Sequence, residues 1–519
     1  MNRVATFLLV ALLAVSAVFA AGNAEAADSA ASSSGGGDSS LTEIRVMVYE
    51  RGSDFPSGYS TADNRTTRWI NEEMAKVGVK VTYVPIPRSS ADNTINTMLA
   101  AGNAPDIVLT YDKARVATYG RQGGLVDLAP YVDRLDPEWL EKASVSALEQ
   151  CQFDGHQYAL PRMFEIYGRS HNTYIRKDIV EELGMEMPAT RDELTAFLYA
   201  VKENYPDMIP YGFSGKITDG KYTNFVLSYT SRADERANYI YEPTFTNILK
   251  EGGKEGLRQL NRFVLDGIIP KDFAIDTDES KFLQNLANGK VAFLMDGSAE
   301  DAYLPYSYDP DYQMWPVDTL PNADGDYIFP SAQPVSNYVY VPKTAEKKID
   351  AVMKYLAFLS NRDNAVDLEY CLLGVGSELN EEGVPVKKSS AELKQMGFAQ
   401  NTGDLDLLKR TLFFGEKNFI DNKVAAASYV PREFFEAEYE IRYNPEHYYD
   451  AKTIGSALAS DQYSPLLQSL IVQLVFKCMT APEGQFDAVY EAEYKNLMDN
   501  HLGQLLQERA DYYDKYVAK

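Results

Sequence analysis

Three strand patterns and two helix patterns alternate near the start of the sequence, and this alternation constrains the fold most strongly. The strand patterns are Ile44–Tyr49, Val79–Tyr83 and Asp106–Thr110, and the stretches between them carry apolar residues at helical spacing. Either Asp63 or Asn64 can cap the first of the two helices. A β-α-β-α-β series predicts a parallel sheet covered by helices, and therefore an α/β fold. In such sheets, ligands lie beyond the carboxyl ends of the strands.

The length and composition of the chain point to a large globular protein that is strongly acidic. A chain of 519 residues is too long for one hydrophobic core, so we expect two or three lobes. The 36 tyrosines suggest amphipathic surfaces that line a cleft, although for any single tyrosine we expect ordinary half-buried packing. A net charge of −25 disfavours partners that require a basic face, such as nucleic acid and anionic membranes.

The cysteine and histidine residues form no pattern typical of a metal or redox site. Cys151, Cys371 and Cys478 lie far apart without a C-x-x-C pair, so at most one disulfide can form. The 4 histidines are also widely spaced. We therefore predict no structural zinc and no cofactor.

One short loop alternates amide and acidic side chains in the manner of a calcium-binding loop. Asn322, Asp324 and Asp326 have this spacing, but Gly325 comes one position too early for an EF-hand and no Glu closes the loop. We therefore expect a hairpin turn at Asp324-Gly325 rather than a metal site, and calcium binding stays an open alternative.

Three short motifs follow one another closely in the first half of the chain. They read G-x-x-Y-A-L-P, I-R-K-D and L-G-x-x-M-P-x-T-x-D-E-L, and they occupy residues 155–161, 175–178 and 183–194. Met98–Ile107 and Gly124–Leu128 add two segments of the same kind. In this order and spacing the chain resembles the carbohydrate-type (family 1) extracellular solute-binding proteins of bacterial ABC importers, in segments as far as its C-terminus.

The resemblance implies a periplasmic-binding-protein-like fold of type II, in which two α/β lobes are joined by a hinge and extra helices follow at the C-terminus. On this basis we expect a first lobe from residues 41–161 and 335–386, and a second from residues 162–334 and 387–519. Pro161 marks a strand end or crossing between them, because proline cannot donate a hydrogen bond to a sheet ladder. Ligand binding should close the lobes by a hinge motion.

By the same resemblance, the chain captures a sugar or oligosaccharide and hands it to the transmembrane permease subunits of an ABC transporter. It would act as a monomer without a cofactor, and its ATPase partner would be a separate chain. No P-loop, G-x-S-x-G or H-E-x-x-H motif occurs, which agrees with a carrier rather than an enzyme. Two alternatives stay open: a secreted glycosidase, which needs only two carboxylates in a cleft, and a receptor for peptides or other solutes.

The N-terminal segment has the pattern of a secretory signal peptide. Arg3 precedes an apolar run, and small residues provide cleavage sites at Ala20 and at Ala26. We expect residues 1–26 to be removed and residues 27–40, rich in Ala, Ser and Gly, to form a flexible leader. An uncleaved membrane anchor is the alternative. No cysteine that could carry a lipid precedes Cys151, so we expect a periplasmic protein.

Local patterns predict several elements of the second lobe. Thr190 and Glu193 form a T-x-x-E capping box before an amphipathic helix. Pro210–Phe213 is expected to be a loop with two exposed aromatic side chains, and Val291–Met295 a strand whose end meets the ligand. Periodicity predicts one long helix over Phe486–Tyr512.

A sugar receptor needs flat aromatic side chains for the apolar ring faces, and carboxylate, amide or guanidinium groups for the hydroxyls. Strand ends of the first lobe offer Tyr49, Glu50, Asp54, Tyr111, Asp112 and Arg115. The crossing near Pro161 and the second lobe offer Arg162, Phe164, Glu165, Tyr167, Tyr211, Phe213, Asp296 and Trp315. Maltose-type members of the family place a sugar-binding carboxylate near the position of Glu165, and a surface ion pair with Arg169 is the alternative role for this residue.

Overall fold

The structure is a computed structural model that describes residues 41–163, 172–216, 221–241, 245–297, 302–307, 309, 312–328, 335–399, 402–408, 416–448 and 458–518. Within these ranges, nothing is stated about the side chains of residues 144–146, 172, 296, 297 and 304. The predicted signal peptide and leader, residues 1–40, lie outside the described part of the chain.

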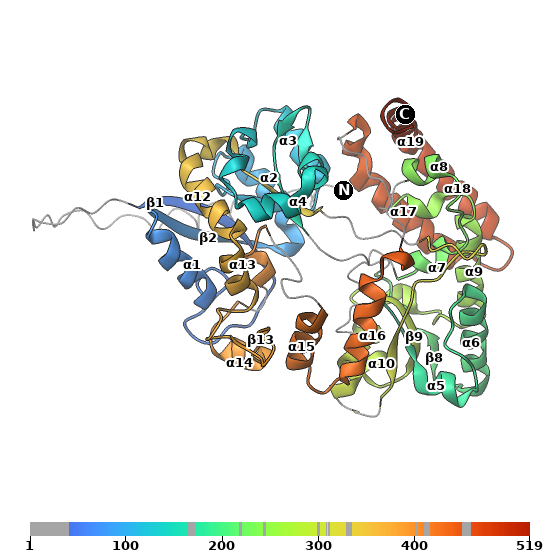
Figure 1. Cartoon of the computed structure of the whole chain (residues 1–519). Helices are drawn as coiled ribbons and strands as arrows, with labels where there is room; N and C mark the ends of the chain where they lie inside the picture. The colour runs from blue at the N-terminus through green and yellow to red at the C-terminus, as the bar shows by residue number, and fades with distance from the viewer. Residues whose placement is uncertain are drawn as a thin grey trace, which may run out of the picture. The chain divides into compact units, whose positions relative to one another are not determined.

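A mixed sheet, joined through one parallel bridge, combines N-terminal strands with one strand from much later in the sequence. Its first two strands are labelled in Figure 1. Its strands are β1 (Thr42–Glu50), β2 (Val79–Pro87), β3 (Val108–Thr110), β6 (Leu160–Met163) and β11 (Val335–Tyr340). β1 and β2 pair in parallel, and a parallel bridge between Val46 and Ile107 adds β3. β11 lies between β3 and β6 and runs antiparallel to both. The parallel arrangement of β1, β2 and β3 confirms the prediction from the alternating patterns.

Helices from two separate parts of the chain cover this sheet. They are α1 (Arg65–Ala75), α2 (Ala91–Ala100), α3 (Lys113–Arg121), α4 (Pro137–Glu149), α12 (Ile349–Ser360) and α13 (Arg362–Glu369). Helix α1 packs on β2, and α12 packs on both β1 and β2. Ile44, Ile70 and Leu356 are fully buried in the resulting core, so strands and helices close on the same apolar interior.

A short segment from later in the sequence completes the same core. Leu405, Leu407 and Leu408 are buried in it, and the indole Nε1 of Trp139 donates a hydrogen bond to the Leu408 carbonyl oxygen at 3.0 Å. This segment lies beyond residue 386, where we expect the first lobe to end.

A second mixed sheet has its own core. Its strands are β7 (Asn172–Arg176), β8 (Ile209–Tyr211), β9 (Val291–Gly297) and β10 (Met314–Val317), in the order β10-β7-β9-β8. Strands β8 and β9 are parallel, and the other neighbours are antiparallel. The strand expected over Val291–Met295 is therefore confirmed.

The remaining helices all follow β7 in the sequence. They are α5 (Lys177–Glu182), α6 (Arg191–Asn204), α7 (Thr223–Leu227), α8 (Glu235–Ile240), α9 (Gly253–Leu265), α10 (Ser280–Ala287), α14 (Ser390–Gln395), α15 (Glu416–Ala426), α16 (Arg432–Tyr443), α17 (Ser464–Met479), α18 (Phe486–Asp499) and α19 (Leu502–Tyr512). The predicted capping box of α6 is present, because Thr190 Oγ1 accepts from Glu193 N and Glu193 accepts from Thr190 N.

Two small antiparallel ribbons connect larger elements. They are β4 (Gln152–Phe153) with β5 (His156–Gln157), and β12 (Ser377–Leu379) with β13 (Pro385–Lys387). Only Asp154 and Gly155 separate β4 from β5, and their φ angles of 55° and 84° are the positive values that a two-residue hairpin turn of type I′ requires.

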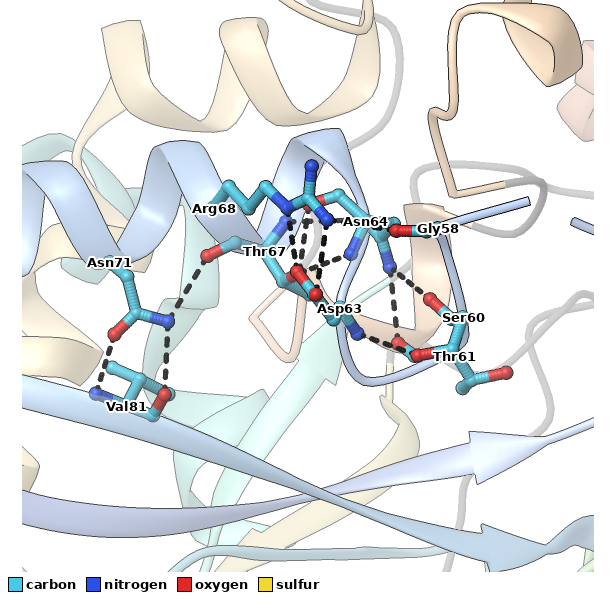
Figure 2. A network of polar contacts seen from close by, with 9 residues as sticks. All are labelled: Gly58, Ser60, Thr61, Asp63, Asn64, Thr67, Arg68, Asn71 and Val81. Atoms are coloured by element: carbon cyan, nitrogen blue, oxygen red, sulfur yellow. Dashed lines mark hydrogen bonds and ion pairs between the residues drawn. The ribbon is translucent and has the colours of Figure 1, made fainter. Parts of the chain in front are cut away.

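Asn64 is the residue that caps helix α1, which resolves the choice between Asp63 and Asn64 (Figure 2). Its Oδ1 accepts from Thr67 N at 3.1 Å, and the Thr67 hydroxyl is 2.8 Å from Asn64 N. Asp63 instead forms an ion pair with Arg68 at 2.7 Å. Farther along the helix, the Asn71 side chain bonds both N–H and carbonyl oxygen of Val81 and so ties α1 to β2.

The long helix expected over Phe486–Tyr512 is wrong, since the structure has two helices there. Helix α18 ends at Asp499, and His501 adopts a left-handed φ of 75° before α19 begins. The His501 ring stacks on Tyr463 with ring centroids 3.7 Å apart. Apolar periodicity continues through the break, so periodicity alone does not reveal it.

The loop at residues 322–326 forms the predicted turn. Gly325 has a positive φ of 85°, and an antiparallel bridge joins Pro321 to Tyr327. Asn322 Oδ1 accepts the backbone N–H groups of Asp324 and Asp326 at 2.9 and 3.0 Å. The amide oxygen of Asn322 is therefore used inside the loop.

Candidate functional site

Aromatic and cationic side chains meet where β1, β2 and β3 end. The rings of Tyr49 and Tyr111 stack with centroids 6.0 Å apart and planes inclined by 28°. Arg88, which follows β2, places its guanidinium 4.9 Å from the Tyr49 centroid and 4.4 Å from the Tyr111 centroid. Cation–π attraction to both rings holds the three side chains together. We call Tyr49, Arg88 and Tyr111 the aromatic platform.

The two rings of the aromatic platform differ in exposure. Tyr49 is buried and donates its hydroxyl to the Leu109 carbonyl oxygen at 3.2 Å, which fixes its ring. Tyr111 is 46% exposed, and large apolar side chains exposed to this extent are few among the described residues. Its ring therefore offers a flat, accessible face at the edge of the sheet where ligands of parallel α/β proteins bind.

An ion pair between the exposed Arg51 and the buried Asp404 supports the platform. Arg51 Nε and Nη2 bind the two carboxylate oxygens of Asp404 at 2.5 and 2.8 Å, and its guanidinium carbon lies 5.5 Å from the Tyr49 ring centroid. Asp404 is buried, so this two-bond pair holds the charge of Arg51 in place. A cavity of about 20 Å³ lies beside Tyr49, Arg51 and Asp404. It has room for a water molecule but not for a sugar ring.

Arg162 and Asn337 lie on strands that adjoin the platform. They are register partners on β6 and β11, and both are buried, with 7% and 1% of their surface exposed. β11 also pairs Tyr338 with Thr110 on β3. Continuing that register by one residue places Asn337 opposite Tyr111 as well, so the three side chains form a row on one face of the sheet.

Nearby positive charges shift the pKa of the Tyr111 hydroxyl. Burial raises its pKa, but the positive charges of Arg162 and Arg88 and contacts with Asn337 and Arg51 outweigh that effect, so the pKa of Tyr111 is lowered. Burial raises the pKa of Tyr49. The environment of Tyr111 is therefore positive and rich in hydrogen-bond donors.

Other predicted residues near the strand ends have partners within the protein. Glu50 accepts from Gly52 N and from the Thr61 hydroxyl, and Asp54 forms an ion pair with Lys394 at 2.7 Å. Asp112 caps α3 by accepting from Arg115 N, and Arg115 pairs with Asp112 and Asp92. Glu50, Asp54, Asp112 and Arg115 stay predictions as ligand contacts.

The structure corrects the expectation for Pro210–Phe213. Tyr211 belongs to β8 and is 0% exposed, and Phe213 is 3% exposed. The two rings pack edge to face with centroids 5.6 Å apart, in the core that surrounds β9. The segment continues the sheet through the parallel pairing of Tyr211 with Phe293 instead of forming an exposed loop, so neither ring faces solvent. We leave both residues out of the proposed site.

The remaining predicted residues divide into one that is described and four that are not. Trp315 on β10 is half-buried, with Lys177 Nζ 4.8 Å from its ring centroid. Phe164, Glu165 and Tyr167 lie outside the described residues, and so does the side chain of Asp296 in β9. All five stay predictions.

Sequence reasoning missed Arg51, Arg88, Asn337 and Asp404. Arg88 follows a strand that ends at the same sheet edge as β1 and β3, and this position was a usable signal. Asn337 and Ser336 are polar residues inside a strand whose other residues are Val and Tyr, which is a weaker signal. No local pattern indicates Asp404, because only the tertiary fold brings it to Arg51, 353 residues away.

The three cysteines are buried thiols, and the described acidic and histidine side chains do not cluster. Cys151, Cys371 and Cys478 are all buried and free, and burial raises the pKa of Cys371 to about 11 and that of Cys478 to about 12. Within the described ranges, no three His, Cys, Asp or Glu side chains gather as a metal site would require. No described helix combines the length and apolar character needed to span a membrane.

The fold and the platform at the strand ends define a class of protein. Residues 59–366 match the family model of the bacterial extracellular solute-binding proteins. The matched part is more than half of the chain, and the chain belongs to this family.

Relatives of known name are similar over part of their length. Lipoprotein LipO of Bacillus subtilis (strain 168) is 23% identical over 363 residues, which are 65% of this chain and 68% of LipO. The polygalacturonan/rhamnogalacturonan-binding protein YtcQ of the same organism is 22% identical over 62% of this chain and 65% of YtcQ. The fructooligosaccharide ABC transporter substrate-binding protein FusA of Streptococcus pneumoniae is 26% identical over 40% of each chain.

Solved structures share the fold over nearly the whole chain. A solute-binding protein of Bifidobacterium longum infantis ATCC 15697, described as binding HMO, has a TM-score of 0.65 at 18% identity, covering 92% of this chain and 100% of its own. FusA in complex with kestose has a TM-score of 0.63 at 14% identity with the same coverage. The likeness confirms the expected α/β fold of the periplasmic-binding-protein type.

Proposed function

We propose that this chain captures an oligosaccharide outside the cytoplasm and delivers it to the permease of a bacterial ABC importer. The observation that carries the proposal is the aromatic platform, in which an exposed Tyr111 ring is backed by Tyr49 and Arg88 at the strand ends. Membership of the solute-binding family supports the role in import. The names of YtcQ, FusA and the diacetylchitobiose-binding protein DasA each specify a saccharide, which supports a sugar as the solute.

The platform matches the surface of a sugar ring. The C–H groups of one ring face pack on the exposed Tyr111 ring, since an aromatic side chain provides apolar area with little conformational freedom to lose. The ring edge carries hydroxyls, for which Asn337 and the arginines supply donors. The small cavity beside Tyr49 is too small for a sugar ring, so the ligand lies on the open side of Tyr111.

The other predicted features belong to the same proposal. Residues of the second lobe and the crossing, among them Glu165 and Asp296, close over the ligand by a hinge motion, and small-angle scattering should then show a smaller radius of gyration with bound glycan. The chain acts as a monomer without catalysis, so a bound oligosaccharide should be recovered intact. An N-terminal sequence of the mature protein that begins after Ala20 or Ala26 would support the signal peptide, and an intact Arg3 would contradict it.

A glycan screen followed by a pair of variants tests the proposal. A bound glycan stabilises the folded chain, so a hit should raise the melting temperature in proportion to the logarithm of its concentration. Tyr111→Ala should then weaken binding roughly tenfold, which corresponds to about 1.4 kcal/mol. Tyr429→Ala is the matched control, because Tyr429 is 45% exposed and lies between α15 and α16.

Two outcomes contradict the proposal. No glycan raising the melting temperature would argue against a saccharide receptor. Equal affinities of Tyr111→Ala and Tyr429→Ala for a genuine hit would mean that sugar binds elsewhere on the chain.

A further inference from the structure

Arg162 is a buried cation whose charge has no counterpart in the described part of the chain. Its side chain is 7% exposed and its Nε makes no hydrogen bond. No described carboxylate forms an ion pair with it, whereas the other arginines of this region, Arg51 and Arg115, bind Asp404 and Asp112. A buried charge without a partner is strongly unfavourable. Its presence in a binding region therefore indicates a role in ligand binding.

The neighbour of Arg162 also presents a buried donor, which lies near enough to the Tyr111 hydroxyl to help lower its pKa. Asn337 is 1% exposed, and its Nδ2 makes no hydrogen bond within the described residues. Its Oδ1 is 2.9 Å from the Ser336 hydroxyl, which also lies 3.1 Å from the Arg162 carbonyl oxygen. Ser336 therefore fixes the Asn337 amide with its N–H₂ group as the free end. The register pairing of Arg162 with Asn337 brings the two buried donors together.

A second cation, Arg88, lies over the Tyr111 ring. Arg88 is exposed, stacks on both platform rings and forms no ion pair with any described residue. The positive charges of Arg162 and Arg88 both act on the Tyr111 hydroxyl. The net charge of the whole chain is −25, so two unpaired arginines beside one exposed aromatic ring are a local exception.

Building on the proposed function, we propose that the captured saccharide is acidic and that its carboxylate binds Arg162 and the Asn337 Nδ2 group while its ring packs on Tyr111. A neutral sugar can accept hydrogen bonds from these donors but leaves the buried charge uncompensated. A carboxylate supplies both the negative charge and two acceptor oxygens, which suit the planar guanidinium. Arg88 adds attraction for the same or an adjacent acidic unit. Uronate-containing oligosaccharides have this chemistry.

Matched acidic and neutral probes test the inference by calorimetry. The acidic probes are short oligogalacturonates and oligomannuronates, and the neutral probes are the same oligosaccharides after reduction of each carboxyl group to the alcohol. At least one acidic probe should bind at least tenfold more tightly than its reduced counterpart. The preference should fall at high salt, mainly through the exposed Arg88.

Substitutions at the arginines test which residues cause the preference for the acidic probe over its reduced counterpart. Arg162→Gln should remove most of the preference for the acidic probe, and Arg162→Lys should restore part of it, since lysine keeps the charge but not the planar pair of donors. The melting temperature of ligand-free Arg162→Gln should equal or exceed that of the wild type, because the change removes a buried charge that no described carboxylate pairs with. A purely structural arginine would give a lower melting temperature. Arg88→Gln, at an exposed position, provides a second variant that should reduce the preference if Arg162→Gln does not fold.

The outcomes separate this inference from the proposed function. Equal or tighter binding of the neutral counterpart, with binding still lost in Tyr111→Ala, overturns the acidic ligand and leaves the sugar receptor standing. Binding of other neutral glycans but of no uronate would likewise overturn the acidic ligand and leave the sugar receptor standing. If no saccharide of either kind binds, the proposed function fails and the inference fails with it.

Discussion

The buried side chain of Asn64 caps helix α1 and both accepts and donates hydrogen bonds. Its Oδ1 accepts from Thr67 N, and its Nδ2 donates to the carbonyl oxygens of Ser60 and Thr61 at 3.2 and 3.1 Å. Asn64→Ala should therefore lower the free energy of unfolding by about 1–2 kcal/mol, near the upper end for lost N-caps. Asp63→Ala, which removes an exposed ion pair with Arg68, should change it by less than about 1 kcal/mol. Urea unfolding measures both, and a larger loss for Asp63→Ala would contradict the assignment of the cap.

Glu279 makes stability depend on pH. Burial raises the pKa of its carboxyl, but contacts with Lys221, Lys216 and Ser214 outweigh this effect and lower it to about 2 from 4.5. Because the folded-state pKa is depressed, the stabilisation is fully present above about pH 4.5 and is lost as pH falls towards 2. Glu279→Gln should lower stability at neutral pH by on the order of 2–3 kcal/mol and flatten the fall between pH 5 and 2.

The control for Glu279 is an exposed ion pair elsewhere in the chain. Glu73 and Lys76 pair at 2.7 Å on the solvent side of α1. Glu73→Gln should change stability by less than about 1 kcal/mol at any pH, because solvent screens such pairs. Chemical unfolding across the acid range gives both results, and parallel pH curves for the wild type and Glu279→Gln would refute the assignment.

At the residue scale, site residues next to a recognisable strand could be predicted from the sequence. Site residues that reach the site only through nonlocal pairing could not. Tyr49 and Tyr111 were predicted from strand ends and Arg162 from the crossing near Pro161, and the structure gathers them around one sheet edge. Asn337 lies beside Tyr111 and Arg162 because β11 inserts between β3 and β6. No local sequence pattern predicts this insertion. Asp404 reaches Arg51 in the same nonlocal way.

At the element scale, the Asp154-Gly155 turn offers a clean test of backbone strain. Gly155 has φ 84°, and a Cβ built there would meet no atom within 4 Å, so only backbone conformation opposes a side chain. Gly155→Ala should lower the free energy of unfolding by about 1–2 kcal/mol, the cost of left-handed backbone for a residue with a Cβ. Gly503→Ala in α19 should instead gain about 0.5–1 kcal/mol from helix propensity, since its nearest neighbour is the movable end of Met498. Destabilisation of equal size at both positions would show that contacts, and not the backbone φ angle, determine the change in the free energy of unfolding.

Elements with both a start signal and a periodic face were predictable, and those lacking one were not. Helix α6 has a capping box at Thr190 and a buried stripe from Leu194 to Val201, and both are present. The helix expected over Phe486–Tyr512 had periodicity without a stop signal, and the left-handed His501 divides it. Pro210–Phe213 read as a loop because of its Pro and Gly, yet parallel pairing with β9 makes part of it a strand.

At the scale of the whole molecule, separate apolar cores surround the two mixed sheets. One core includes residues from β1 to Met163 and from Val335 to Leu408, and another includes residues from Ile175 to Ile328 and from Tyr448 to Leu505. Two such cores in a chain of the solute-binding family support the proposal of two lobes that capture a solute by hinge closure. The described residues change core between Met163 and Ile175 and again between Ile328 and Val335, and Leu405, Leu407 and Leu408 still belong to the first core. The lobe boundaries themselves stay a prediction.

The most direct test of the account is a crystal structure of the chain with the glycan that raises its melting temperature most. We expect a sugar ring packed on the exposed face of Tyr111, with a polar or charged group of the sugar within hydrogen-bond distance of Arg162 and Asn337. A glycan bound away from the ends of β1, β2 and β3, with Tyr111 free of contact, would contradict the central claim.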